Sequence, residues 1–282
     1  MATTVTHYVD PNSTGGDGTT NGLSGATAAY ASLSAWNTAE ARDLVAADEI
    51  ERVICSSDDA GSTHAADTLK FNMTAWTTDA TRYIQIESAS SHGGKWNDTI
   101  YRHQTSNGMA IQIAGTDQVN DVRFIGIQLY CTGISGVNHG GIYFRDSTRT
   151  RGYFLIDKCI LRGYGASTFA NCDGVQDYLS GTHTVEIRNS ILYDWDSTAT
   201  TSGAITVFTA GNTVNVYNCT INNCYNGIYR QGTAVVNATN VGAYGCTVEF
   251  AAGVTQTTCS DVTATFVDDT NKDFHLQSGD TT

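Results

Sequence analysis

One short phrase returns through the central part of the chain, and a phrase that returns every 20 to 50 residues or so, as a rough range, indicates a repeat architecture. Each copy has an aliphatic residue, two spacers, a small residue and then a short β-prone run. The copies are Ile156-Asp-Lys-Cys159-Ile160-Leu161, Ile187-Arg-Asn189-Ser190-Ile191-Leu192, Val216-Tyr-Asn218-Cys219-Thr220-Ile221 and, more weakly, Val236-Asn-Ala-Thr239-Asn240-Val241. The small residues Cys159, Ser190, Cys219 and Thr239 follow one another after 31, 29 and 20 residues. We interpret them as a column of small inward side chains. Asparagine precedes the small residue in two copies, with Lys158 and Ala238 in the others.

A second phrase, a glycine followed by a short β-prone run, alternates with the first. Its copies are Gly141-Ile-Tyr143-Phe, Gly174-Val-Gln176, Gly203-Ala-Ile-Thr206-Val and Gly227-Ile-Tyr229. Propeller blades of about 40 to 45 residues need four strands, and leucine-rich repeats need leucine and asparagine at fixed spacing, so neither fits. Units of 20 to 33 residues with two or three short strands predict a parallel β-helix, whose coils stack about 4.8 Å apart.

Length and composition agree with one all-β domain. The chain has 282 residues, 28 of them glycine and only one proline, which suits many short strands joined by tight turns. We predict a single domain: an N-terminal loop and capping helix in 1–50, β-helix coils in 51–265 and a closing segment in 266–282. The helix is predicted from Ala35 to about Ala47 with Ser34 as its N-cap, and its apolar face would cover the open end of the stack. Residues 88–108 are predicted to be an excursion from the stack.

The net charge of −13 argues against nucleic-acid and anionic-membrane partners. The first residues contain neither a basic n-region nor an apolar h-region, and no apolar run reaches the roughly 18 residues that a membrane span needs. We therefore expect neither a secretion signal nor a transmembrane segment.

The eight cysteines include no CxxC pair, so zinc-type spacing is missing. We expect them to be reduced and mostly buried as small apolar residues. In the N-terminal loop, Asp10, Asn12, Asp17 and Asn21 offer oxygen ligands for Ca²⁺, although their spacing is not that of an EF-hand. Turn hydrogen bonding is the preferred interpretation of Asp10 and Asp17, and we predict no cofactor, with Ca²⁺ as the alternative.

Several of these features together resemble the right-handed parallel β-helix superfamily that includes pectate lyases. They are Tyr8-Val-Asp-Pro11 with its glycine-rich loop, the capping helix, the repeated phrase, and the closing Phe266-Val-Asp and Asp273-Phe274-His-Leu276. The resemblance covers nearly the whole chain and implies a right-handed, single-stranded parallel β-helix. That superfamily contains lyases, hydrolases, epimerases and non-enzymatic proteins of phage particles and bacterial surfaces, so the fold alone does not determine activity.

An enzyme of this superfamily would place carboxylates, a base and often Ca²⁺ along one exposed sheet, and a glycoside hydrolase needs two carboxyls about 5 to 9.5 Å apart. The candidates are Asp157, Asp173, Asp177, Glu186, Asp194 and Asp196, with His139 and His183. Asn171-Cys-Asp173-Gly-Val-Gln-Asp177 and Asn138-His139-Gly-Gly resemble polygalacturonase motifs in part, so an enzyme would use Asp173, Asp177 and His139. Their order departs from that family, in which the aspartates precede the histidine. The Arg-x-Pro-x-x-Arg motif of pectate lyases is missing, since the only proline is Pro11.

Tyrosines recur through the coils, and those that point outward could stack on sugars or form a subunit interface. They are Tyr143, Tyr153, Tyr164, Tyr178, Tyr193, Tyr217, Tyr225, Tyr229 and Tyr244. Without a complete catalytic motif, we predict a non-catalytic phage virion protein, a capsid decoration (cement) protein or spike. We expect it to be made in the host cytoplasm, to form a homotrimer on the virion surface, and to contact a major capsid or tail protein and surface glycans. The alternative is a polysaccharide lyase or glycoside hydrolase.

Overall fold

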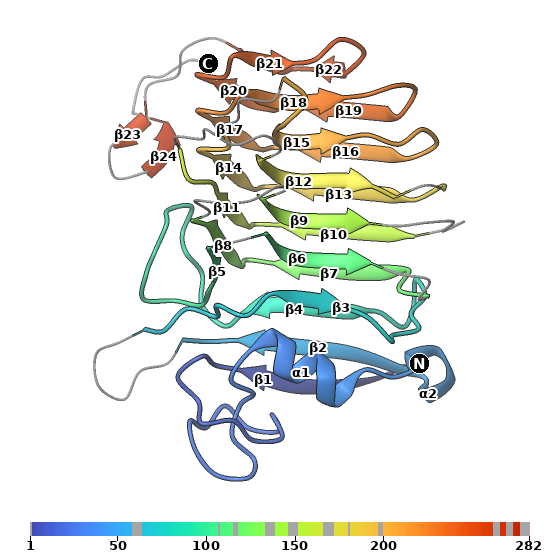
Figure 1. Ribbon diagram of the computed structural model, residues 1–282, viewed down its shortest axis with the longest axis vertical. Coiled ribbons are helices and arrows are strands. Elements are labelled where there is room, and N and C mark those ends of the chain that lie inside the picture. The colour runs from blue at the N-terminus through green and yellow to red at the C-terminus, as the bar shows by residue number, and fades with distance from the viewer. Residues whose placement is uncertain are drawn as a thin grey trace.

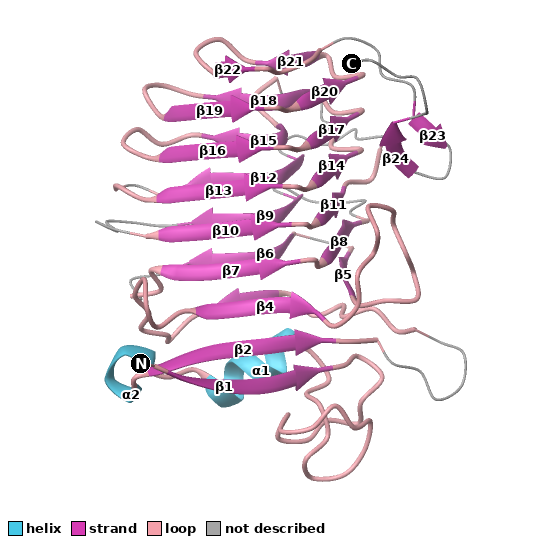
Figure 2. Ribbon diagram, turned by 180° about the vertical axis from the view of Figure 1, so that it is seen from behind, coloured by secondary structure: helices cyan, strands magenta, loops and turns pink. Residues whose placement is uncertain are grey.

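The computed structural model is a right-handed parallel β-helix, as the sequence predicts (Figure 1). It describes residues 2–57, 64–106, 108–114, 118–132, 139–145, 152–165, 172–179, 181–196, 200–261, 266–268 and 273–276. Within these residues the coils form three parallel sheets of nine, six and seven strands. The nine-stranded sheet is in front in Figure 2, and the seven-stranded sheet is in front in Figure 1.

Each sheet stacks one strand from successive coils. The nine-stranded sheet contains β1 (Thr3–Val9), β2 (Glu49–Cys55), β4 (Ile84–Ser88), β7 (Asp121–Ile125), β10 (Tyr153–Asp157), β13 (Thr184–Arg188), β16 (Thr213–Tyr217), β19 (Val235–Thr239) and β22 (Thr255–Thr257). The six-stranded sheet contains β5 (Arg102–Thr105), β8 (Gln128–Cys131), β11 (Ile160–Arg162), β14 (Ile191–Tyr193), β17 (Thr220–Asn222) and β20 (Gly242–Tyr244). The seven-stranded sheet contains β3 (Phe71–Met73), β6 (Met109–Ala114), β9 (His139–Arg145), β12 (Cys172–Tyr178), β15 (Gly203–Val207), β18 (Asn226–Arg230) and β21 (Val248–Phe250).

The interior is built from columns of apolar side chains in register. Alternate residues of a strand face the same side, so equivalent residues of neighbouring strands lie above one another. One fully buried column consists of Val53, Ile86, Phe124, Ile156, Ile187, Val216 and Ala238. The repeated phrase therefore marks the inner face of the nine-stranded sheet and the corner that follows it.

At that corner the backbone turns through the left-handed region, which asparagine tolerates better than most residues. Asn189, Asn218 and Asn240 have φ angles of 51°, 52° and 53°. Asn218 Nδ2 donates to Asn189 Oδ1 at 3.3 Å, and Asn240 Nδ2 donates to Asn218 Oδ1 at 2.8 Å. The three side chains form an asparagine ladder on the outside of the corner.

The ladder corrects our alignment of the fourth copy. Cys159, Ser190 and Cys219 are equivalent, as predicted, but Thr239 pairs with Tyr217 rather than with Cys219. In the fourth copy, Asn240 and not Ala238 is therefore equivalent to Asn218. Val241 is equivalent to the small residue Cys219. The error arose because the fourth copy contains both a threonine and an asparagine within two residues, and only strand pairing distinguishes the two alignments.

Two helices lie at the N-terminal end. α1 (Leu33–Glu40) begins two residues earlier than predicted, because Ser32 rather than Ser34 is its N-cap and accepts from Ala35 N at 3.0 Å. The predicted continuation to Ala47 is also wrong, since the chain leaves the helix at Ala41. Asp43 then caps a separate short helix, α2 (Leu44–Ala47).

α1 lies against β3 at the lower end of the seven-stranded sheet, where later coils have a strand (Figure 1). Trp36 of α1 packs on Phe71 and stacks on Trp76, with ring centroids 5.9 and 5.3 Å apart. Leu33 N–H is bound by the Asp67 carboxylate at 2.7 Å, a distant partner that local sequence does not reveal. Residues 1–50 also supply β1, which pairs with β2 and is the first strand of the nine-stranded sheet.

The outer side of the six-stranded sheet is covered by two segments (Figures 1 and 2). One is the predicted excursion, which ends earlier than residue 108 because Arg102–Thr105 forms β5. The other is the antiparallel hairpin of β23 (Phe266–Asp268) and β24 (Asp273–Leu276), which lies beside this sheet rather than across the last coil. Phe274 packs on Tyr193, with centroids 4.9 Å apart.

All eight cysteines are free, and six of them are buried, as the sequence predicts. No helix among the described residues combines the length and apolar character needed to cross a lipid bilayer.

Candidate functional site

The seven-stranded sheet carries the residues that an enzyme was predicted to use, on the neighbouring strands β9 and β12. Cys172 pairs with His139 and Asp173 with Gly140, so the two strands bring His139 and Asp173 close together in the sheet. The His139 side chain lies outside the described residues. β12 bends at Gly174, where an added Cβ would lie 2.5 Å from the carbonyl oxygen of Ala204 and 2.9 Å from the Trp195 indole nitrogen.

The equivalent positions in neighbouring strands are Gly141, Ala204 and Gly227. The second repeated phrase thus marks a bend at which only a small residue fits under the next coil. Its third copy was misaligned by one residue, because Ala204 rather than Gly203 occupies this column. Gly174 and Val175 both face the interior, and this bend puts Asp173 and Asp177 on opposite sides of the sheet.

Asp173 lies on the outer side of the sheet and is fully buried. Its Oδ1 accepts hydrogen bonds from Thr206 Oγ1 at 2.6 Å and Gly203 N at 3.0 Å. Its Oδ2 is also buried and has no hydrogen-bond partner within the described part of the chain. Burial raises the pKa of Asp173 to about 7, although the two hydrogen bonds act in the opposite direction. A carboxyl with this pKa is partly protonated at neutral pH.

Asp177 points into the interior, in register with the buried residues Phe144 and Val207. Its carboxylate contacts His183 Nε2 at 2.9 and 3.0 Å and accepts from Asn212 Nδ2 at 3.1 Å. All three side chains are buried, and His183 Nδ1 and Asn212 Oδ1 have no partner among the described residues. Asp177 is therefore part of a buried polar cluster at the turn from the seven-stranded to the nine-stranded sheet.

These positions do not match the geometry of a glycosidase pair. Asp177 follows Asp173 by four positions, which corresponds to about 13 Å along a strand, whereas the paired carboxyls of glycosidases are about 5 to 9.5 Å apart. The two carboxyls also face opposite sides of the sheet, and Asp177 is already occupied by His183 and Asn212. Sequence spacing could not reveal this, because a regular strand would put both on one face.

Of the other candidate carboxylates, Asp157 and Asp194 contact side chains of a neighbouring coil, whereas Glu186 pairs within its own strand. Asp157 pairs with Arg188 at 3.1 Å and accepts from Asn189 at 2.8 Å. Glu186 pairs with Arg188 at 2.9 Å. Asp194 accepts from Asn223 Nδ2 at 2.8 Å at a second corner of the stack, and Asp196 is half-buried.

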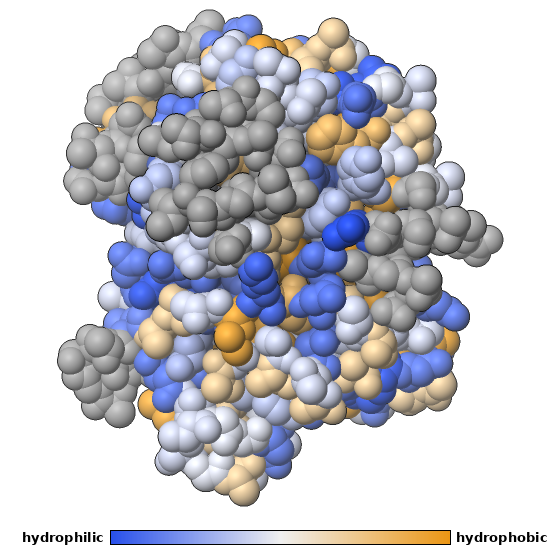
Figure 3. Space-filling view, in the orientation of Figure 1, coloured by the Kyte–Doolittle hydropathy of each residue, from blue (hydrophilic) through white to orange (hydrophobic). Residues whose placement is uncertain are grey.

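An aromatic row lies on the outer side of the seven-stranded sheet. We use this name for Tyr178 of β12, Phe208, which directly follows β15, and Tyr229 of β18. The rings of Tyr178 and Phe208 are 5.4 Å apart, and those of Phe208 and Tyr229 are 6.2 Å apart. Tyr178 is 53% exposed, and the other two are half-buried. Figure 3 shows hydrophobic and hydrophilic groups interspersed over the visible part of this face.

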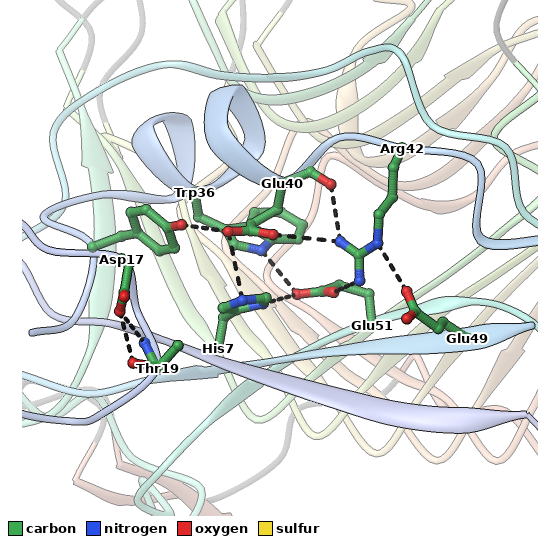
Figure 4. A network of polar contacts seen from close by, with 9 residues as sticks. His7, Asp17, Thr19, Trp36, Glu40, Arg42, Glu49 and Glu51 are labelled. Atoms are coloured by element: carbon green, nitrogen blue, oxygen red, sulfur yellow. Dashed lines mark hydrogen bonds and ion pairs between the residues drawn. The ribbon is translucent and has the colours of Figure 1, made fainter. Parts of the chain in front are cut away.

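The N-terminal loop uses its carboxylates for turns. Asp10 is fully buried and accepts from Asn12 N at 2.8 Å and Ser56 Oγ at 3.0 Å. Asp17 accepts from the backbone and hydroxyl of Thr19, at 3.0 and 2.7 Å (Figure 4). Across the residues that the structure describes, no three His, Cys, Asp or Glu side chains converge as they would around a metal ion.

Sequence reasoning missed a buried charged network at the N-terminal end (Figure 4). Glu51 occupies an inward position that is apolar in later coils, and it contacts His7 Nδ1 at 2.6 Å, Trp36 Nε1 at 3.0 Å and Arg42 Nη2 at 2.9 Å. Burial lowers the pKa of His7, but the hydrogen bond to Glu51 and the negative charges of Glu51 and Glu40 outweigh it, so the pKa is raised. The sequence contained one indication of this network: Glu51 lies two and four residues before Val53 and Cys55, so on a strand all three side chains face the interior.

Comparison with known proteins gives no match, either to a protein-family model or to a curated protein sequence.

Proposed function

We propose that this protein is a non-catalytic structural component of a virus particle, a capsid decoration protein or a spike of the kind found on phages. The aromatic row is the observation that carries the proposal. It places an exposed Tyr178 and the half-buried Phe208 and Tyr229 on a rigid parallel sheet. Aromatic and arginine side chains are enriched at protein interfaces, and Arg145 is an exposed neighbour of Tyr178 in register.

The positions of the carboxylates support a binding role over a catalytic one. Asp177 is buried within a polar cluster, Asp157 and Asp194 bind side chains of adjacent coils, and Glu186 pairs with Arg188 of its own strand. These carboxylates contribute to cohesion of the stack. The sheet then serves as a platform, and the aromatic row is the surface that contacts a second copy of the chain in a homotrimer.

Light scattering tests this assignment. We expect the wild-type protein to have three times the chain mass of 30.1 kDa. The double variant Tyr178→Ser/Phe208→Ser should be a folded monomer, because it removes the aromatic contact area. The matched control is Val235→Ser, which alters a side chain 50% exposed on the nine-stranded sheet and should leave the trimer intact. A wild-type monomer, or a double variant that stays trimeric, would contradict the proposal.

The proposal that the protein belongs to a virus particle rests on the family resemblance, and it is tested separately. We expect genes beside the one for this protein to encode a capsid protein and a portal. Neighbouring genes for a sugar-uptake system would contradict a virion role and favour an enzyme.

A second candidate function, a polysaccharide lyase or hydrolase, is favoured by Asp173. Its pKa of about 7 and its unpartnered Oδ2, as judged over the described residues, are properties of a general acid. Incubation with acidic and neutral polysaccharides, followed by assays for unsaturated products and reducing ends, tests this function. Turnover that is lost in Asp173→Asn would establish the enzyme and overturn the structural proposal.

A further inference from the structure

Cys224 and Cys246 occupy equivalent positions in adjacent coils. Asn222 pairs in register with Tyr244, and each cysteine follows two residues later. Each thiol contacts the carbonyl oxygen two residues before it, at 3.2 Å for Cys224 and 3.7 Å for Cys246, so the two corners share one local conformation. Neighbouring parallel strands lie about 4.8 Å apart, which is within the roughly 4.4 to 6.8 Å that separates the Cα atoms of a disulfide.

The two thiols differ in their surroundings. Cys224 is 3% exposed, whereas Cys246 is half-buried between the exposed residues Gly245 and Thr247. Interaction with the neighbouring Cys224 thiol lowers the pKa of Cys246, although burial acts in the opposite direction. Burial raises the pKa of Cys224, and the neighbouring Cys246 raises it further. Cys246 is therefore the more accessible and the more acidic of the two neighbouring thiols.

This pairing is not a general property of the cysteine columns. Cys219 is as deeply buried as Cys224, but the equivalent residues in the coils beside it are Ser190 and Val241. Reactive cysteines of redox sites are accessible, have a lowered pKa and lie beside a resolving thiol. Cys246 and Cys224 meet all three conditions.

We propose that Cys246 and Cys224 form a peroxide-reactive dithiol site, in which Cys246 is the nucleophile and Cys224 the resolving thiol. Cys246 releases its proton, and the thiolate attacks one oxygen of hydrogen peroxide. The O–O bond breaks, Cys246 becomes a sulfenic acid, and the leaving hydroxide takes up the released proton to give the first water. Cys224 sulfur then attacks the Cys246 sulfur, the S–O bond breaks, and the Cys224 proton leaves with the hydroxyl as water. Two thiols are oxidised to one disulfide, and one peroxide is reduced to two molecules of water.

The disulfide would join β17 and β20 through their following corners and so fasten the last two complete coils together. This inference does not rest on the proposed virion function, because its test measures the oxidation of two thiols and not the oligomeric state.

Peptide mapping under non-reducing conditions tests the site in the full-length protein after treatment with hydrogen peroxide. We expect a linked Cys224–Cys246 peptide and the loss of two free thiols. In Cys224→Ser, dimedone should trap a sulfenic acid on Cys246, and alkylation of Cys246 by iodoacetamide should require a higher pH than in the wild type. Cys219→Ser is the control and should still form the link.

Two results would overturn the inference. One is that peroxide leaves Cys246 no more oxidised than the buried cysteines. The other is that the pH dependence of Cys246 alkylation is the same in Cys224→Ser as in the wild type, which would show that Cys224 does not stabilise the thiolate. Circular dichroism of each variant confirms that the fold is retained, and Cys224→Ala provides a second substitution at the same position.

Discussion

At the scale of single residues, burial rather than sequence pattern decides what each candidate carboxyl can do. Asp173 and Asp177 belong to one strand and one sequence motif, yet burial raises the pKa of Asp173 to about 7, whereas Asp177 is bound by His183 and Asn212. The motif identified Asp173 and Asp177, which both lie on β12. It could not show which way each side chain points, because the bend at Gly174 depends on Trp195 and Ala204 of the next coil.

Asp173 should make the protein less stable as pH rises. Its pKa is about 7 in the folded protein against an ordinary 3.8, so its proton stabilises the fold fully below pH 3.8, and this stabilisation is lost as pH rises to about 7. At about 1.36 kcal/mol per pKa unit, the loss amounts to about 4 kcal/mol. Melting temperatures of wild type and Asp173→Asn between pH 4 and 8 measure it. As pH rises, the melting temperature of Asp173→Asn should increase relative to that of the wild type. Asp98→Asn changes an exposed carboxyl and should show the same pH dependence of melting temperature as the wild type. A constant gap between wild type and Asp173→Asn would contradict the assignment.

At the scale of elements, the repeated phrase predicted strands and corners well, because each copy has an inward aliphatic residue and a turn at the same place. Register was predicted for Cys159, Ser190 and Cys219 and missed for Thr239. The helix was predicted to continue to Ala47, whereas Asp43 caps the separate helix α2. At the start of α1, Leu33 N–H is bound by the distant Asp67 carboxylate. Tertiary hydrogen bonds of this kind leave little trace in a local sequence window.

The asparagine ladder should contribute measurably to stability at its central position. Asn218→Ala places a Cβ residue at a φ of 52° without the local hydrogen bonding of asparagine, and it removes both ladder bonds. We expect a loss of about 1 to 2 kcal/mol. Asn218→Gly loses the bonds but relieves the backbone, so it should be less harmful than alanine. Thermal unfolding of both variants provides the comparison, and an alanine variant as stable as wild type would show that the ladder contributes nothing.

The network beneath α1 should make the N-terminal end sensitive to pH. The pKa of His7 is raised above its ordinary value of 6.5, so its stabilisation is complete below pH 6.5 and is lost as pH rises through the folded value. Hydrogen exchange of β1 and β2 should therefore become faster, relative to the intrinsic rate, as pH increases above neutrality. In His7→Gln this additional acceleration should be absent. If the hydrogen-exchange protection of β1 in the wild type did not change with pH, His7 would not stabilise this end of the molecule as proposed.

At the scale of the whole molecule, α1 lies below β3 at the N-terminal end of the seven-stranded sheet. The outer side of the six-stranded sheet is covered by the excursion and the C-terminal hairpin. The seven-stranded sheet carries the aromatic row on its outer side, with Tyr178 exposed. The sequence predicted the all-β solenoid and the presence of outward tyrosines. It could not predict that Tyr178, Phe208 and Tyr229 align on one sheet, because coil lengths vary and only strand pairing brings the three together.

A cryo-electron microscopy reconstruction of the purified protein tests the central claim most directly. The account predicts a trimer in which the three copies meet through the outer side of the seven-stranded sheet, with Tyr178 and Phe208 buried between them. A particle of one chain, or a trimer that contacts through another face and leaves Tyr178 in solvent, would contradict it.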